Sequence, residues 1–268
     1  MYAFDIIIPN NRFQEKHDKQ YESWIHLAYS YVYQLDRTRQ IAKQDHTVIV
    51  DGLTLRIPVV CPELDSLALK NHSSFCRKTR EEIEENADVK IKIVQVGVDA
   101  DNPNYKVPEN SSFFILRTGW ESPLLCGDTH QPIPLYKLFE FDPKMDFDDI
   151  HFWALDYERL HGLWISGLYE DFAEAELQNH DSRINQQGRV LCRQIEKLTG
   201  IPTFLFLPNF RDWSEAEDHN WTCPITHKEW KIDGKTREDF IAFKCDESRL
   251  VSELSMNAVP RNDDHRGS

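Results

Sequence analysis

Two short cysteine-containing segments near the C-terminus constrain the fold of this chain more than any other feature. Cys223-Pro-Ile-Thr226 is followed, after residues 227–244, by Cys245-Asp-Glu-Ser248. A zinc ribbon holds its metal with two Cys-x2-Cys turns separated by a hairpin of roughly 15–20 residues. The spacing fits that pattern at all four positions, so we expect residues 220–255 to fold as a ribbon-like hairpin unit.

The second position of each turn carries a hydroxyl where a ribbon carries a thiol. Thr226 and Ser248 are poor zinc ligands because their oxygens stay protonated near neutral pH. His219 and His227 are the residues that could complete a site. The two remaining thiolates do not form a structural zinc site alone, so we expect a vestigial ribbon without cofactor. A ribbon without metal must keep its shape through packing, and three aromatic residues are available for this: Trp221, Trp230 and Phe243.

The other cysteines give no further ligand set. Cys126-Gly-Asp-Thr129 repeats the pattern, so Cys126 is a third vestigial position beside Cys223 and Cys245. Cys61 and Cys76 are expected to be ordinary buried thiols. The cysteines are too sparse for a disulfide-stabilised scaffold. The sequence shows neither the basic start of a signal peptide nor an apolar run of about 18 residues. We therefore expect a cytoplasmic protein without a membrane-spanning segment.

Hydrophobic periodicity predicts helices and strands along the whole chain. Strands are expected at residues 4–8, 89–98, 112–118 and 203–207, and a hairpin at 47–60 around Asp51-Gly52. Helices are expected at residues 18–44, 74–86, 148–177 and 181–198. One face of the 148–177 helix carries four apolar residues that we expect to lie in the core: Trp153, Leu160, Trp164 and Leu168.

This pattern predicts an α+β fold. An N-terminal domain, residues 1–120, should combine a mixed sheet with helices. A C-terminal region, residues 121–255, should pack helices on the degenerate ribbon hairpin. Residues 256–268 should form a flexible tail.

The charge balance bears on the class of partner. The net charge is −14, from 45 acidic and 31 basic residues. Nucleic-acid affinity depends on basic side chains that displace counterions, so nucleic acid is disfavoured as the main ligand. An acidic surface instead attracts basic proteins. The chain has no phosphate-binding glycine loop, Gly-x-Ser-x-Gly elbow or His-Glu-x-x-His motif, so we expect no enzymatic activity.

Four segments of the second half resemble a known family: SPLLCGDTHQPIPLYKL (122–138), GRVLCRQIEKLTGIPTFLFL (188–207), CPITHKEW (223–230) and CDESRLVSELS (245–255). They are similar to an uncharacterised proteobacterial family described as zinc-ribbon-containing and suggested to bind nucleic acid. The resemblance covers residues 119–255. It implies cysteines where this chain has Thr129, Thr226 and Ser248, which is why zinc and a nucleic-acid role are not expected to carry over.

Three classes of function remain. The first is a non-enzymatic protein-binding inhibitor, such as an immunity protein that neutralises a bacterial toxin, for example a nuclease, by blocking its basic substrate site. The alternative is a nucleic-acid-binding protein of the zinc-ribbon type. The third is a metal-dependent enzyme using Asp142, Asp146, Asp148 and Asp149, which otherwise form a solvated helix N-terminus. For the first class we expect five acidic residues to contact the partner: Asp148, Asp149, Glu170, Asp171 and Glu174.

Overall fold

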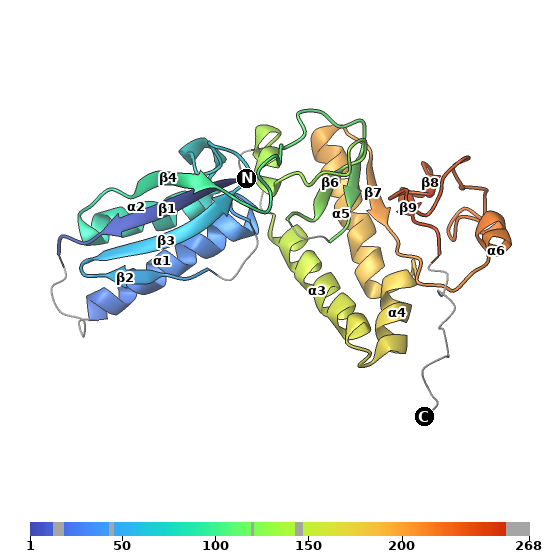
Figure 1. The fold of residues 1–268 in the computed structure, drawn as a ribbon, viewed down its shortest axis with the longest axis horizontal. Coiled ribbons are helices and arrows are strands. Elements are labelled where there is room, and N and C mark those ends of the chain that lie inside the picture. The colour runs from blue at the N-terminus through green and yellow to red at the C-terminus, as the bar shows by residue number, and fades with distance from the viewer. Residues whose placement is uncertain (13–18, 43–45, 119–120, 143–146, 256–268) are drawn as a thin grey trace, which may run out of the picture. The chain divides into compact units, whose positions relative to one another are not determined.

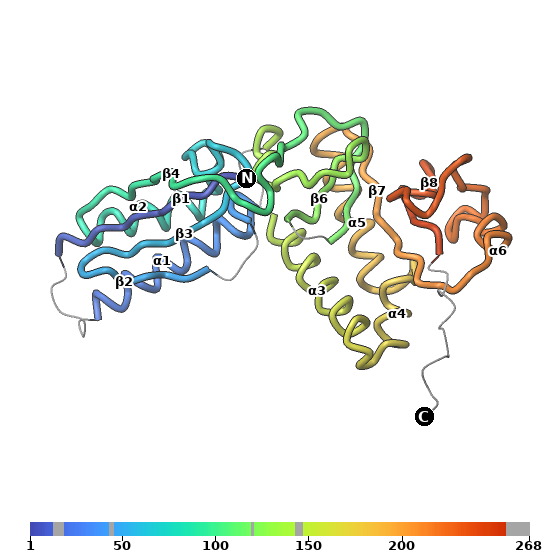
Figure 2. Tube along the Cα trace, in the orientation of Figure 1, coloured from blue at the N-terminus to red at the C-terminus, as the bar shows by residue number. Residues whose placement is uncertain are grey.

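The chain forms two compact units in the computed structural model (Figures 1 and 2). The structure describes residues 1–12, 19–42, 46–118, 121–142 and 147–255. Unit 1 comprises Met1–Ser111 with Gly119–His151, and unit 2 comprises Ser112–Thr118 with Phe152–Ser268. Both units combine helices with a sheet, so the predicted α+β class is confirmed. The predicted flexible tail and Asp146 lie outside the described residues.

Unit 1 contains a βαββαβ arrangement. Its elements are β1 (Tyr2–Pro9), α1 (Lys19–Arg37), β2 (Ile49–Asp51), β3 (Thr54–Cys61), α2 (Ser74–Ala87) and β4 (Lys92–Val98). The strand order is β2-β3-β1-β4, and all neighbours are antiparallel. This is the split βαβ topology, in which each crossover helix lies over one face of the sheet. The predicted hairpin at Asp51-Gly52 is confirmed, with Gly52 in the left-handed region at φ +61°.

The core of unit 1 lies between the sheet and its two helices. Alternate residues of β1 and β3 are buried on the helix side, as expected for strands with one covered face. Trp24 and Tyr31 of α1 and Ile83 of α2 fill the space below them. Cys61 and Cys76 belong to this cluster, and burial raises the pKa of both thiols. The expectation that they are ordinary buried thiols is confirmed.

Shorter elements complete unit 1. These are the 3-10 helices η1 (Leu69–Asn71) and η2 (Leu135–Glu140) and the strand β6 (Leu124–Cys126). The chain turns back along β6 after the strand ends, since the Ile133 amide donates to the Leu124 carbonyl at 2.7 Å.

Unit 2 contains a sheet whose neighbouring strands come from distant parts of the sequence. Its strands are β5 (Phe114–Leu116), β7 (Thr203–Phe206), β8 (Phe243–Cys245) and β9 (Leu250–Ser252). They lie in the order β5-β7-β9-β8, with β5, β7 and β9 parallel and β8 antiparallel to β9. The helices are α3 (Asp148–Ile165), whose residues 148–151 are assigned to unit 1, and α4 (Glu170–Gln178), α5 (Arg183–Thr199) and α6 (Glu215–Asn220). α5 ends at Gly200, at φ +73°, as the sequence predicts.

Two predictions about this region are wrong. The boundary at residue 120 assigns residues 112–118 to the N-terminal domain, but Phe114, Ile115 and Leu116 pair in parallel with Thr203–Leu205 and belong to unit 2. The continuous 148–177 helix is broken after Ile165, where Gly167 and Tyr169 take left-handed conformations at φ +68° and +58°. A left-handed residue cannot continue a right-handed helix, so α4 starts in a new direction.

The break changes which side chains of α3 form the core. Trp153 is 1% exposed and Tyr157 is buried, whereas Leu160 and Trp164 are only half-buried. Leu168 lies beyond the break and is 59% exposed. The buried stripe therefore covers only the first half of the predicted apolar face. No helix among the described residues is long and apolar enough to cross a membrane.

An ion pair fixes the end of the last hairpin to α5. Arg249 donates to Glu196 through two hydrogen bonds, Nη2–Oε1 at 2.7 Å and Nε–Oε2 at 2.9 Å. The hydrogen bonds from Arg249 hold the pKa of Glu196 below its usual range, although partial burial opposes them. A carboxyl whose pKa is depressed on folding stabilises the protein above its unfolded pKa and loses this contribution as the pH falls.

We expect Glu196→Gln to lower the free energy of unfolding by about 1 kcal/mol at pH 7. The difference from the native chain should shrink as the pH falls below the usual range of a glutamate, because the stabilisation from a depressed pKa is lost as the folded carboxylate becomes protonated. Urea unfolding at pH 7 and at acidic pH measures this. The matched control is Glu247→Gln, since the Lys228–Glu247 pair is mostly exposed and its loss should have almost no effect. Equal losses in both variants would contradict the assignment.

Candidate functional site

The hairpin unit brings the four ribbon positions together. Cys223 Sγ lies 3.2 Å from Ser248 Oγ, and Thr226 Oγ1 lies 3.6 Å from Cys245 Sγ. Each contact joins a residue of the first turn to a residue of the second. The side chains that the spacing singled out therefore face each other, although two of them are hydroxyls.

The turns share one backbone geometry. In the first turn the His227 amide donates to the Cys223 carbonyl at 2.8 Å, and the Cys223 amide donates to the Lys228 carbonyl at 2.9 Å. His227 is left-handed at φ 56°, and Arg249, four residues after Cys245, is left-handed at φ 55°. The turn shape is thus kept in both copies without the second cysteine.

The Cys126 turn is a third copy of this geometry, and it belongs to unit 1. The His130 amide donates to the Cys126 carbonyl at 2.8 Å, and His130 is left-handed at φ 58°. The thiol donates to the Asn110 carbonyl at 3.6 Å. Burial raises the pKa of Cys126, but hydrogen bonds from Ser111 and Thr129 outweigh it and lower the pKa overall. The Cys126 sulfur is therefore hydrogen-bonded by the hydroxyl groups of Ser111 and Thr129.

The thiol of Cys245 has a similar environment. Burial raises its pKa, but hydrogen bonds from the side chain and backbone of Ser248, and from Thr226 and Cys223, together lower it. Such bonds favour the thiolate, as a metal site would require. Two sulfurs and two alcohol oxygens are nevertheless not a structural zinc donor set.

The histidines do not supply the missing ligands. His219 and His227 are both exposed. Within the described ranges, no three His, Cys, Asp or Glu residues are grouped so as to hold a metal ion. The side chains present at the four ribbon positions therefore do not fit zinc.

Aromatic packing supports the hairpin, as the sequence predicts. The ring centroids of Trp221 and Trp230 lie 4.7 Å apart, and Phe243 lies 4.9 Å and 5.2 Å from the two. The Trp230 indole also donates to the Trp221 carbonyl at 3.0 Å. On the other side of Trp221, the Arg211 guanidinium lies 4.9 Å from its ring centroid. These contacts give the unit an aromatic core of its own.

The five acidic residues expected to contact a partner are divided between the two units. Asp148 and Asp149 belong to unit 1, where Asp148 is ion-paired with Arg37. Glu170 and Asp171 are exposed in the first turn of α4 in unit 2. Glu174 is half-buried and accepts a hydrogen bond from Gln178 at 2.7 Å. Asp148 and Glu174 thus already have partners within the chain. Of the five residues, Glu170 and Asp171 are the exposed pair in unit 2.

Large apolar side chains occur in the same short segment of the chain as that pair. Four of them are more than half exposed, and we call them the α3–α4 patch: Ile165 at 66%, Leu168 at 59%, Tyr169 at 70% and Phe172 at 55%. The helical period of the sequence predicts that Leu168 lies in the core, but Leu168 is exposed. Gly167 was the signal that the helix could end there, which releases the following residues from the buried stripe.

Comparison with known proteins gives a family for this α+β protein. Residues 108–208 match the domain of unknown function DUF2310, and residues 213–258 match the domain of unknown function DUF8594. A Haemophilus influenzae protein described as an uncharacterized protein is 31% identical over 210 residues, which cover 77% of this chain and 79% of the relative. The chain therefore belongs to the same family as this protein.

A second uncharacterized protein of Haemophilus influenzae is 35% identical over 137 residues, which cover 51% of this chain and 66% of that relative. No solved structure matches the chain significantly.

Proposed function

We propose that this protein acts by binding another protein, without catalysis of its own. The observation that supports this best is the α3–α4 patch, in which aromatic and aliphatic side chains are exposed beside Glu170 and Asp171. Exposed apolar residues in one short segment are typical of interaction sites. Aromatic anchors with a polar or charged rim are what tight protein interfaces use.

The charge of the chain indicates the kind of partner. With a net charge of −14 and two carboxylates beside the patch, a basic protein is favoured over an acidic one. In such a complex the rim carboxylates should set the association rate and its salt dependence. The aromatic anchors should set the dissociation rate.

The particular form that we propose is a stoichiometric inhibitor in the cytoplasm, such as an immunity protein that blocks the basic substrate site of a toxin nuclease. All six cysteines are free, in keeping with a reducing compartment. The alternative, nucleic-acid binding by the ribbon-like unit, would require basic side chains that the overall charge does not favour.

We expect a basic protein to co-purify with the tagged chain from its native host and to bind the patch. Tyr169→Ala with Phe172→Ala should weaken the purified complex by a factor of about 1000, since anchor residues each contribute about 2 kcal/mol or more. Glu170→Lys with Asp171→Lys should slow association and reduce its salt dependence. Biolayer interferometry at low and physiological salt measures both effects.

The matched control is Glu81→Lys with Glu82→Lys, which makes the same charge change on exposed positions of α2 in unit 1. It should leave the dissociation rate unchanged. A partner that binds all these variants equally would contradict the proposed patch. Tight binding of duplex DNA at physiological salt, with no protein partner recovered, would favour the nucleic-acid alternative instead.

A further inference from the structure

The carboxyl ends of three neighbouring parallel strands meet at one edge of the unit 2 sheet. β5 is parallel to β7, and β7 is parallel to β9. Arg117 directly follows β5, and Glu253 directly follows β9. Between them, residues 207–210 follow β7. In sheets of this kind, ligands bind outside the carboxyl ends of the strands.

Arg117 is held at this edge by aromatic rings. Its Cζ atom lies 4.1 Å from the centroid of Phe206 and 4.6 Å from the centroid of Phe240. The guanidinium forms no hydrogen bond or ion pair with any part of the chain that the structure describes. The rings restrict the side chain while its N–H donors remain available, which lowers the entropy cost of binding.

Three ionisable groups lie within the electrostatic reach of Arg117. Burial raises the pKa of Glu253, and Arg117 partly opposes this. Burial lowers the pKa of His161, and Arg117 lowers it further. Tyr157, one turn before His161 on α3, is buried and has a raised pKa that Arg117 partly offsets. Burial therefore disfavours the charged form of all three neighbours of Arg117.

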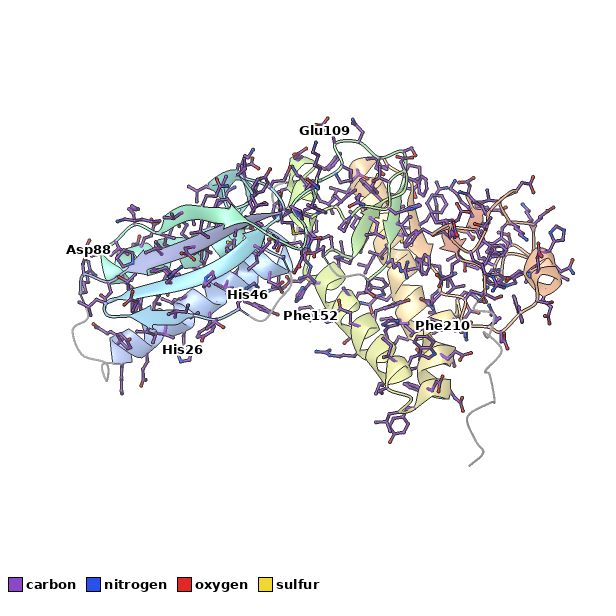
Figure 3. The ribbon with its side chains drawn as sticks, viewed as in Figure 1. His26, His46, Asp88, Glu109, Phe152 and Phe210 are labelled. Atoms are coloured by element: carbon purple, nitrogen blue, oxygen red, sulfur yellow. The ribbon has the colours of Figure 1, made fainter. Side chains whose placement is uncertain are left out.

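Aromatic residues continue from this group to the segment after β7. The His161 ring stacks on Trp164 with centroids 5.7 Å apart, and Trp164 stacks on Phe210 at 4.1 Å with an interplanar angle of 16°. Phe210, labelled in Figure 3, is half-buried, as are His161 and Trp164. These rings give the edge a partly exposed apolar surface beside the cation.

We propose that this edge binds a small ligand through an oxyanion, either a carboxylate or a phosphate, held by the guanidinium of Arg117. The planar fork of arginine N–H groups matches the geometry of both anions and binds them through paired hydrogen bonds. The site shares no residue with the α3–α4 patch. Its test is therefore independent of the proposed protein partner.

Isothermal titration calorimetry of the full chain at constant ionic strength tests the site, with inorganic phosphate and succinate as separate probes. At least one probe should bind the native protein saturably, and the one that binds identifies the source of the oxyanion. Arg117→Gln should weaken binding by a factor of about 10 or more, from the loss of charge-assisted hydrogen bonds. Arg193→Gln, which removes an exposed arginine from α5, should change nothing.

Glu253→Gln provides a test in the opposite direction. It removes a carboxyl group that interacts electrostatically with Arg117, so it should strengthen binding of the same probe several-fold. This variant keeps the proposal testable if Arg117→Gln fails to fold. The site is disproved if neither probe binds the native protein, or if the loss is as large in Arg193→Gln as in Arg117→Gln. It is equally disproved if Glu253→Gln binds more weakly than the native chain.

Discussion

Replacing Thr226 and Ser248 together by cysteine is expected to give the protein one tightly bound zinc ion per chain. The contacts Cys223–Ser248 at 3.2 Å and Thr226–Cys245 at 3.6 Å place the four positions close together. In a tetrahedral four-cysteine site with Zn–S bonds of about 2.3 Å, neighbouring sulfurs lie about 3.8 Å apart. The backbone thus holds the positions near the separation that zinc requires.

Elemental analysis after dialysis under reducing conditions measures the zinc content. The native chain should hold no stoichiometric zinc, and Thr226→Cys alone should hold far less than the double variant. Structural zinc sites of this type bind with roughly 10–16 kcal/mol, so the double variant should also melt at a clearly higher temperature with zinc than with a chelator.

Adding Cys223→Ala to the double variant should remove the gain. One zinc per native chain, lost on Cys223→Ala, would show that the ribbon is not vestigial. A double variant that binds no zinc while remaining folded would show that the four positions are not a ribbon site. Either result would also contradict the interpretation of the Cys126 turn as a third vestigial position.

Trp153→Ala is expected to lower the free energy of unfolding by about 3–5 kcal/mol, the range for removing a large buried side chain. Trp153 is almost fully buried, and its indole donates to the Ile184 carbonyl at 2.9 Å. A Cβ at Gly188 would lie 3.2 Å from the indole and 2.7 Å from Leu205. α5 therefore approaches the ring so closely that the space left by alanine would remain largely unfilled.

Trp164→Ala is the matched control on the same helix. Trp164 is half-buried and stacks on Phe210 at 4.1 Å, so its loss should cost clearly less than that of Trp153. Urea unfolding followed by circular dichroism measures both variants. If Trp164→Ala lowers the free energy of unfolding as much as Trp153→Ala does, Trp164 is a core residue, as the sequence predicts, and is not half-buried.

Much of unit 1 could be predicted from the sequence because its signals are local. Asp51-Gly52 specifies a two-residue turn, since Gly52 must take a positive φ. The alternating pattern of β1 and β3 has the period of a strand with one buried face. The packing of Trp221, Trp230 and Phe243 was also predictable, because a small hairpin unit gains stability by burying the few large apolar side chains that it has.

The Arg117 edge could not be predicted. Its strands β5, β7 and β9 are only three or four residues long, and they pair across long stretches of chain. A segment this short has no periodicity that tells a parallel partner from an antiparallel one. Arg117, Phe240 and Glu253 therefore carry no shared pattern in the sequence, although the fold places them together.

The sequence by itself determined the elements whose causes lie within a few residues: the Asp51-Gly52 turn, the end of α5 at Gly200, and the spacing of Cys223 and Cys245. It also determined the acidic charge. Only the tertiary structure decided which turns face each other, that Leu168 lies exposed, and that Arg117 rests on two phenylalanine rings. These depend on long-range pairing, whose free energy comes from burying surfaces that are distant in sequence, and no local pattern encodes which surfaces will meet.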